Sequence, residues 1–128
     1  MNAILNYLVH LGLAALLLVV FFKAYTWLTP YDEVTLIRQG NHAAAFSLGG
    51  AMLGFSLTIG SSILHTNTVQ QFVGWAFGAM IVQALGYAIT TRCLKMAQDQ
   101  IEADNSAFGG LLGTISLSIG GINAACIS

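Results

Sequence analysis

Apolar residues are gathered in four long blocks along this chain, and polar residues fill the short stretches between them. The blocks cover about residues 5–28, 43–64, 69–90 and 107–127. A helix needs about 20 mostly apolar residues to cross the hydrocarbon core of a bilayer. Backbone amides find no hydrogen-bond partner in hydrocarbon, so each block must be helical despite its glycines. The pattern therefore predicts four transmembrane helices.

The composition agrees with this class and excludes others. Of the 128 residues, 56% are hydrophobic and 7% are charged, whereas soluble domains carry about 25% charged residues. The net charge of −1 provides no basic field for nucleic acid. We expect an all-α fold, a four-helix transmembrane bundle that forms a single membrane domain over residues 1–128.

The four basic residues predict which way the bundle faces. Lys23, Arg38, Arg92 and Lys95 lie in or beside the first and third connections, whereas both termini and the turn at 65–70 contain no lysine or arginine. Because basic loops stay in the cytoplasm, we expect the charged loops to be cytoplasmic and both termini to lie outside. All five acidic residues fall on the same, cytoplasmic side.

The second half of the chain resembles the first at an offset of 60 residues. The segments 49–60 and 109–120 share a pair of glycines and a Ser-x-x-x-Gly run. Each half contains one pair of spans, so both halves have the same orientation in the membrane. We predict a parallel tandem repeat of two helical hairpins, at about 1–64 and 65–128. Convergence of two glycine-rich helices is the alternative.

Small residues form stripes on the second and fourth spans, because steps of three and four residues place them on one face. The candidates for helix packing are Ser47, Gly50, Gly54, Thr58 and Ser61 on the second span, and Gly109, Gly113, Ser116, Gly120 and Asn123 on the fourth. A second stripe, Gly110, Thr114, Ser118 and Gly121, lies beside the first on the fourth span.

These stripes predict an inner pair made of the second and fourth spans, with the bulkier first and third spans facing membrane lipid. Small residues let two helix backbones approach closely. Two stripes on one helix need neighbours on two sides, which four spans barely supply, so we expect a homo-oligomer. The same residues would also suit the lining of a narrow pore, but their small size favours close packing.

Few polar groups lie deep within the predicted spans, and none of them is charged. Gln83 lies near the middle of the third span and Asn123 lies within the fourth. Such amides usually hydrogen-bond across helices, and the lining of a hydrophilic path is the alternative. A carboxylate inside the membrane would mark a proton-coupled transporter, but no acidic residue lies between the predicted span boundaries.

No residue pattern in the chain indicates catalysis, a cofactor or a metal. His10, His42 and His65 fall at different depths and share no carboxylate, so they are not expected to form a metal site. Cys93 and Cys126 lie at opposite membrane faces, too far apart for a disulfide. We assign no catalytic, cofactor-binding or metal-binding residue and expect no enzymatic activity.

The first connection carries the signal of a short helix. Thr29 is predicted to cap this helix and Pro30 to take its first position. A glycine and an asparagine at 40–41 then end it. The residues that suit docking of a cytoplasmic or membrane protein partner are Thr29, Pro30, Asp32, Glu33, Arg38 and Asn41. Alternatively, this connection only reverses the direction of the chain between two spans.

A combination of residues spread over essentially the whole chain carries a family resemblance. These are Leu28-Thr29-Pro30, Glu33, Leu36-Ile37-Arg38, Asn41, Ala43-Ala44 and Gly54, and then Asn105, Ala107, Gly113-Thr114, Gly120-Gly121 and Asn123-Ala124-Ala125-Cys126. Together they resemble the YjfL-type family of uncharacterised bacterial inner-membrane proteins. The resemblance implies a four-span inner-membrane protein connected with envelope or membrane stress, and it brings no established activity.

The leading functional hypothesis is a membrane scaffold or adaptor that self-associates through the small-residue faces of the second and fourth spans. It follows from abundant packing surface without charge inside the membrane. An oligomeric channel for small solutes or ions is the alternative. A proton-coupled exporter ranks below both, because the sequence shows no carboxylate within a span.

Overall fold

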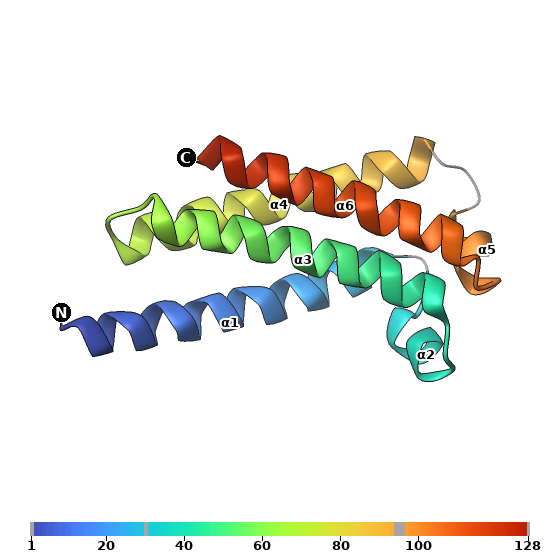
Figure 1. Ribbon diagram of the computed structural model, residues 1–128, viewed down its shortest axis with the longest axis horizontal. Helices are drawn as coiled ribbons and strands as arrows, with labels where there is room; N and C mark the ends of the chain where they lie inside the picture. Colours follow the sequence, from blue (N-terminus) through green and yellow to red (C-terminus); the bar gives the residue numbers. More distant parts are fainter. Residues whose placement is uncertain (1, 30, 94–96, 128) are drawn as a thin grey trace.

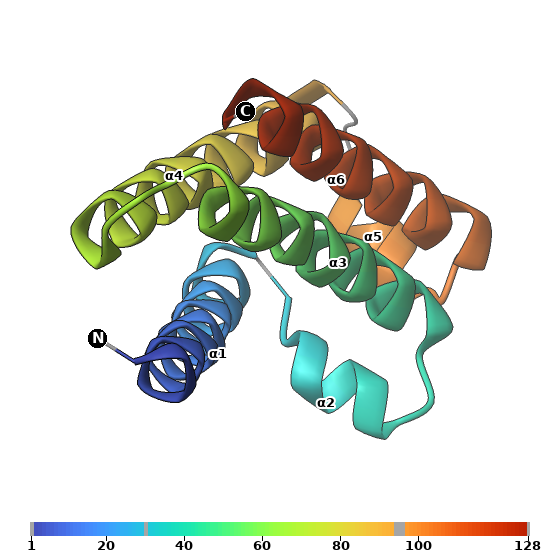
Figure 2. The same ribbon diagram turned by 60° about the vertical axis from the view of Figure 1, so that its left-hand side comes forward.

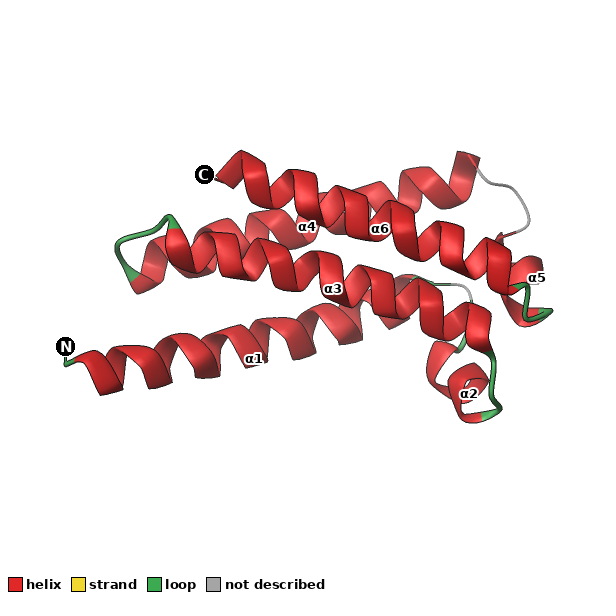
Figure 3. Cartoon of the chain, viewed as in Figure 1, coloured by secondary structure: helices red, strands yellow, loops and turns green. Residues whose placement is uncertain are grey.

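The computed structural model describes residues 2–29, 31–93 and 97–127, and these residues form helices joined by short turns (Figures 1 and 3). In chain order the helices are α1 (Ala3–Leu28), α2 (Glu33–Arg38), α3 (His42–Leu64), α4 (Val69–Cys93), α5 (Ala97–Glu102) and α6 (Ser106–Ile127). The described part of the chain contains no strand. The all-α prediction is confirmed.

Four of these helices are long and apolar enough to cross a membrane: α1, α3, α4 over Val69–Thr90, and α6. They run along the long axis of the molecule (Figures 1 and 2). The short helices α2 and α5 lie at one end, here called the loop end, and both termini lie at the other (Figure 1). The predicted spans agree with these helices within two residues at each boundary.

Asparagine side chains begin three of the four long helices. The Oδ1 atoms of Asn2, Asn41 and Asn105 each accept a hydrogen bond from the backbone amide three residues later, at 2.7, 2.8 and 3.2 Å. Such caps satisfy amides that have no partner within the helix. Asn41 therefore begins α3 rather than ending α2 as predicted. Gly40, whose φ of +85° suits glycine, terminates α2.

The start of α2 also differs from the prediction. α2 begins at Glu33, and its cap is Asp32, whose side chain accepts a hydrogen bond from the Thr35 amide at 3.2 Å. Thr29 instead follows the last turn of α1. The predicted cap was wrong because α1 continues to Leu28, and the chain then needs several residues to turn before a new helix begins. Pro30 lies outside the described residues.

The core lies between α1, α3 and α4 and is built around aromatic rings. Phe21 of α1 stacks on Phe55 of α3 with ring centroids 4.5 Å apart, and Tyr25 packs against Tyr87 of α4 at 4.8 Å. α3 contacts all the other described helices and is the central element (Figure 2). α3 and α6 do pair, as predicted, but α6 exposes one of its faces. The expectation that the third span lies outside was wrong, because α4 contributes to the core.

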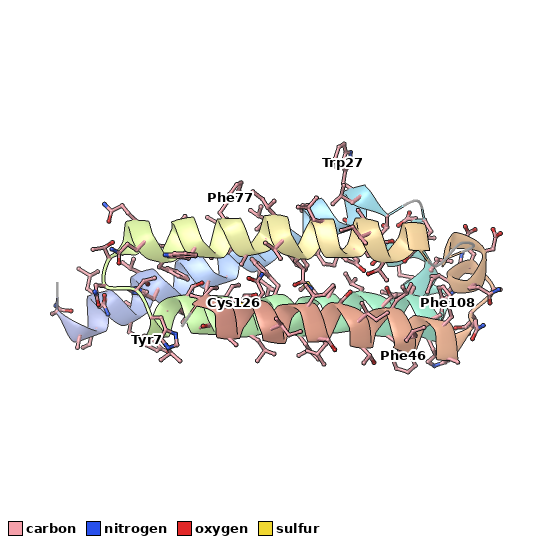
Figure 4. The ribbon with its side chains drawn as sticks, turned by 90° about the horizontal axis from the view of Figure 1, so that it is seen from above. Tyr7, Trp27, Phe46, Phe77, Phe108 and Cys126 are labelled. Atoms are coloured by element: carbon pink, nitrogen blue, oxygen red, sulfur yellow. The ribbon has the colours of Figure 1, made fainter. Side chains whose placement is uncertain are left out.

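Large apolar side chains cover the outside of the bundle, as a bilayer requires. Trp27 is 83% exposed, and Trp27 and Phe77 project away from the helices (Figure 4). Along α1 most leucines and valines are exposed, and only Leu17, Phe21 and Tyr25 are buried. α1 therefore presents a lipid-facing surface over most of its length, as its bulky sequence predicts.

Candidate functional site

Helices α3 and α6 lie in backbone contact along a line of glycines. A Cβ atom added at Gly50 would overlap the backbone of Gly113, and one added at Gly113 would overlap the Phe46 carbonyl group. A Cβ atom at Gly54 would lie 2.7 Å from the carbonyl oxygen of Ser116. These neighbours are backbone atoms and cannot swing aside as a side chain can. Glycine is therefore required for the two helices to approach this closely.

The structure brings the predicted packing residues together inside one chain. Gly109 lies against Ala43, and Gly120 lies against Gly54. Ser47, Thr58 and Ser116 are buried. The Ser61 hydroxyl donates a hydrogen bond across the pair to the Ala124 carbonyl at 2.6 Å. The first stripe of α6 is thus covered by α3 and does not face a second molecule.

The two amides deep within the spans, Gln83 and Asn123, bond across helices, as the sequence predicts. The Gln83 Nε2 atom donates to the carbonyl oxygen of Ser116 at 2.8 Å, and Asn123 Nδ2 donates to the Ala79 carbonyl at 3.2 Å. Both bonds join α4 to α6. Gln83 is buried, with 2% of its surface exposed, and its Oε1 atom has no partner.

The second stripe of α6 faces outward. A Cβ atom added at Gly110 or Gly121 would meet nothing within 4 Å. Thr114 and Ser118 are exposed, and their hydroxyls donate to carbonyls of their own helix. Beside this stripe, a shallow groove runs between α3 and α6 on the outside of the bundle. Here called the outer groove, it is lined by Phe46, Gly49, Leu53, Gly110, Thr114 and Leu117, among others.

The residues predicted for partner docking separate into exposed and buried ones. Asp32 and Arg38 are exposed. Thr29 and Asn41 are 8% and 7% exposed, and Glu33 is fully buried. The exposed residues leave only part of α2 for a partner, and docking there stays a prediction.

A cluster of buried polar side chains surrounds Glu33. The Tyr25 hydroxyl lies 3.4 Å from Ser47 Oγ, and the Tyr31 hydroxyl lies 3.4 Å from the Tyr87 hydroxyl. The Glu33 carboxyl group is close enough to act electrostatically on all three tyrosines. These five residues, here called the loop-end cluster, come from α1, the α1–α2 connection, α2, α3 and α4. They converge where the helices meet at the loop end.

The Glu33 carboxyl group accepts no hydrogen bond, although both of its oxygens are buried. The nearby Thr29 hydroxyl donates instead to the carbonyl oxygens of Thr26 and Tyr31, at 3.0 and 3.2 Å. Burial raises the pKa of Glu33 to about 7; the Thr29 hydroxyl opposes this rise and the charge of Asp32 adds to it. This pKa lies well above that of an exposed glutamate.

The two adjacent acids of α2 differ in their chemistry. The Asp32 carboxylate is exposed and accepts hydrogen bonds from the Thr35 hydroxyl at 2.6 Å and the Thr35 amide, which lower its pKa. Burial has the opposite effect on Glu33, and it also raises the pKa of Tyr31. Asp32 thus stabilises the start of α2, whereas Glu33 is an acid enclosed by the bundle.

Sequence reasoning missed the loop-end cluster and treated Glu33 as a surface residue. No acidic residue lies within a span, as predicted, yet one is buried against the ends of the spans. A signal was present in α2, because Glu33 and Leu36 are three residues apart and share a helix face. Leu36 packs against the buried residues near the loop end. Finding this face required the correct helix start, which the capping pattern placed three residues too early.

The three histidines and Cys126 do not come together, and the Cys93 side chain lies outside the described part of the structure. His10 stacks on Phe72 with centroids 5.4 Å apart, His42 lies 3.8 Å from the Asp104 carboxylate, and His65 lies beside Ser61. Cys126 is exposed near the C-terminus, at the end opposite to the loop end. Within the described ranges, no group of three His, Cys, Asp or Glu side chains is placed to hold a metal ion.

Four helices long and apolar enough to cross a bilayer indicate a multi-pass membrane protein. Comparison with known proteins gives its family. The chain belongs to the family described as Domain of Unknown Function (DUF350), which matches residues 1–127. This result confirms the resemblance seen in the sequence.

Two relatives from different bacteria match over nearly their whole length. The chain is 25% identical over 128 residues to the UPF0719 inner membrane protein YjfL of Escherichia coli K12, covering 100% of this chain and 97% of that protein. It is 30% identical over 129 residues to the UPF0719 transmembrane protein YshE of Bacillus subtilis 168, covering 98% and 96%. No solved structure matches the chain.

Proposed function

We propose that the protein is a non-enzymatic module of the bacterial inner membrane that self-associates through the outer groove between α3 and α6. The inner-membrane location is supported by the name of the Escherichia coli relative. We place the loop end in the cytoplasm, because Lys23 and Arg38 lie toward it and the opposite end carries no basic residue. The module would act as a scaffold, or it would recruit a protein partner through the exposed side of α2. Either role would belong to envelope or membrane stress.

The outer groove is the observation that carries the self-association proposal. Gly49 of α3 and Gly110 of α6 leave open space on the membrane-facing surface. Lipid chains fill such a surface poorly, whereas a second helix packs on small residues with close backbone contact. We propose that the outer groove of one molecule packs against the outer groove of a second copy. A two-fold dimer uses the same surface of both subunits, so a single self-complementary groove is enough to form it.

Two substitutions test the groove without disturbing the fold of one chain. Gly49→Ile and Gly110→Ile place a bulky side chain where an added Cβ meets nothing within 4 Å. We expect both to reduce the assembly to a monomer in mild detergent, measured by light scattering with size-exclusion chromatography. Gly12→Ile is the matched control, because Gly12 is equally open but lies on α1. An unchanged mass for both groove variants contradicts the proposal.

A channel is the second candidate, and the buried polar groups favour it. The loop-end cluster continues toward the middle of the bundle through Ser116, which lies beside Tyr25 and whose carbonyl accepts the Gln83 bond. An apolar core would have sufficed for packing alone. Flux of ions or small solutes into proteoliposomes tests this candidate, and flux no greater than that of empty vesicles eliminates it.

We further propose that the chain arose by duplication of a helical hairpin. In support, α2 spans 33–38 and α5 spans 97–102, an offset of 64 residues, and the caps Asn41 and Asn105 have the same offset. The sequence match has an offset of 60. The difference of four residues is about one helical turn, so both alignments place Gly50 and Gly54 of α3 on the second stripe of α6.

A further inference from the structure

The interior of the loop end contains a carboxyl group that accepts no hydrogen bond. Both oxygens of Glu33 and the Oε1 atom of Gln83 are buried without a partner. Among the described residues, no lysine or arginine contributes to the electrostatic environment of Glu33. A buried acceptor without a donor costs free energy, and an ionised carboxylate costs more. Within the part of the chain that the structure describes, the site therefore has no positive charge to balance an ionised carboxylate.

We propose that Glu33 is a proton-binding site enclosed by the bundle, which exchanges one proton with the solution at the loop end. In the protonated state the carboxyl group is neutral and tolerates burial. On release of the proton, the hydroxyls of Tyr25 and Tyr31 rotate to donate hydrogen bonds to the carboxylate. This proposal is independent of self-association, and it gives the chain an enclosed acid just beyond the ends of its spans.

The described groups that face Glu33 supply no positive charge. Asp32 on the same helix is exposed, Tyr25 comes from α1, Tyr31 from the connection and Tyr87 from α4. α3 contributes the uncharged Ser47, and the titratable residue at this end of α3, His42, is exposed beside Asp104.

A proton suits this site better than a metal cation. Protonation removes the charge of the carboxylate, whereas a metal cation adds a second buried charge that needs several oxygen ligands. The cluster offers one carboxylate, and its hydroxyls already contact one another at 3.4 Å. The pKa of Glu33, which burial raises to about 7, agrees with proton exchange at neutral pH.

The protonation state of Glu33 is coupled to the packing of α2 against the long helices. Tyr31, Glu33 and Leu36 all turn inward from the same short segment. The ionised form of Glu33 is better solvated when this segment separates from the bundle, because water then supplies hydrogen-bond donors. The neighbouring Asp32 is already in contact with solvent, so a small displacement of α2 is enough to let the proton enter or leave.

The composition of the chain permits a direct test. Glu33 and Glu102 are its two glutamates, and Glu102 is exposed on α5. Carbon-13 labelling of the glutamate carboxyl carbon therefore gives two NMR signals from the full-length protein in detergent micelles, and Glu33→Gln removes one of them and so assigns both. We expect the Glu33 signal to titrate with a midpoint near 7, well separated from the Glu102 signal. Titration of both signals together, or no titration of the Glu33 signal at any pH, overturns the proposal.

Two further arms distinguish a proton from a metal cation and test the role of Tyr31. The titration is repeated in sodium, potassium and choline chloride at equal ionic strength, and an equal midpoint in all three is expected. A lower midpoint in sodium or potassium would identify a metal-cation site and overturn the proton assignment. Tyr31→Phe should raise the midpoint by about one pH unit by removing a donor to the ionised form. Tyr7→Phe, at an exposed tyrosine, is the control and should leave it unchanged.

Discussion

At the scale of single residues, the energetics of the loop end depend on the form in which Glu33 is buried. A buried carboxyl group without partners is tolerated as the neutral acid and penalised as the anion. Tyr25, Tyr31 and Tyr87 surround Glu33 with hydroxyls that contact serine or one another instead. The fold therefore favours the protonated form, and its stability must depend on pH.

The first prediction concerns that dependence. Because the pKa of Glu33 rises from 4.5 in the unfolded chain to about 7 in the fold, the native state holds a proton that the unfolded state releases between these values. The contribution of Glu33 to the free energy of unfolding is therefore greatest below about pH 4.5. It falls by about 3 kcal/mol as the pH rises to about 7, and stays constant above that.

The Glu33→Gln variant isolates this contribution, since glutamine keeps the shape and has no charge. Relative to the wild type, it should gain stability as the pH is raised from about 5 to about 8. Thermal unfolding followed by circular dichroism in detergent measures the difference. Parallel curves for the two proteins at all pH values would show that Glu33 has the same pKa in the fold as in the unfolded chain, which means that its carboxyl group is solvated in the fold.

At the scale of the helices, what could be predicted from the sequence was local and what was missed depended on tertiary contacts. The spans follow from runs of apolar residues, and the glycine stripes follow from helical periodicity. The partner of a stripe is not a local property. Gly113 and Gly110 look equivalent in the sequence, yet one contacts the Phe46 carbonyl and the other faces open space. The burial of Glu33 escaped prediction likewise, because it requires the ends of several helices.

This difference between two glycines of α6 yields the second prediction. Gly113→Ala adds a methyl group against the backbone of α3 and should destabilise the chain by about 1–3 kcal/mol. Gly110→Ala adds the same group where there is space, and should change stability by no more than about 0.5 kcal/mol. The two positions share one helix, so intrinsic helix propensity cancels in the comparison. Equal unfolding temperatures would mean that α3 and α6 are not in backbone contact.

At the scale of the whole molecule, the two ends of the bundle differ in chemistry. All five acidic residues lie in or beside α2 and α5, whereas the opposite end carries both termini and the uncharged turn between α3 and α4. An even number of spans places the termini on one side. Lys23 and Arg38 lie toward the loop end, so the positive-inside tendency favours a cytoplasmic loop end. The enclosed Glu33 would then exchange protons with the cytoplasm.

The last prediction tests this orientation by cysteine labelling. In a chain whose Cys93 and Cys126 are replaced by serine, Asn67→Cys places a thiol in the exposed turn between α3 and α4, and Gln39→Cys places one in the exposed end of α2. A maleimide that cannot cross membranes, added to intact spheroplasts, should label Asn67→Cys at once and Gln39→Cys only after permeabilisation. The reverse labelling pattern would mean that the same fold has the opposite orientation in the membrane. Glu33 would then sense the outer side, and any partner of α2 would have to lie outside the cell.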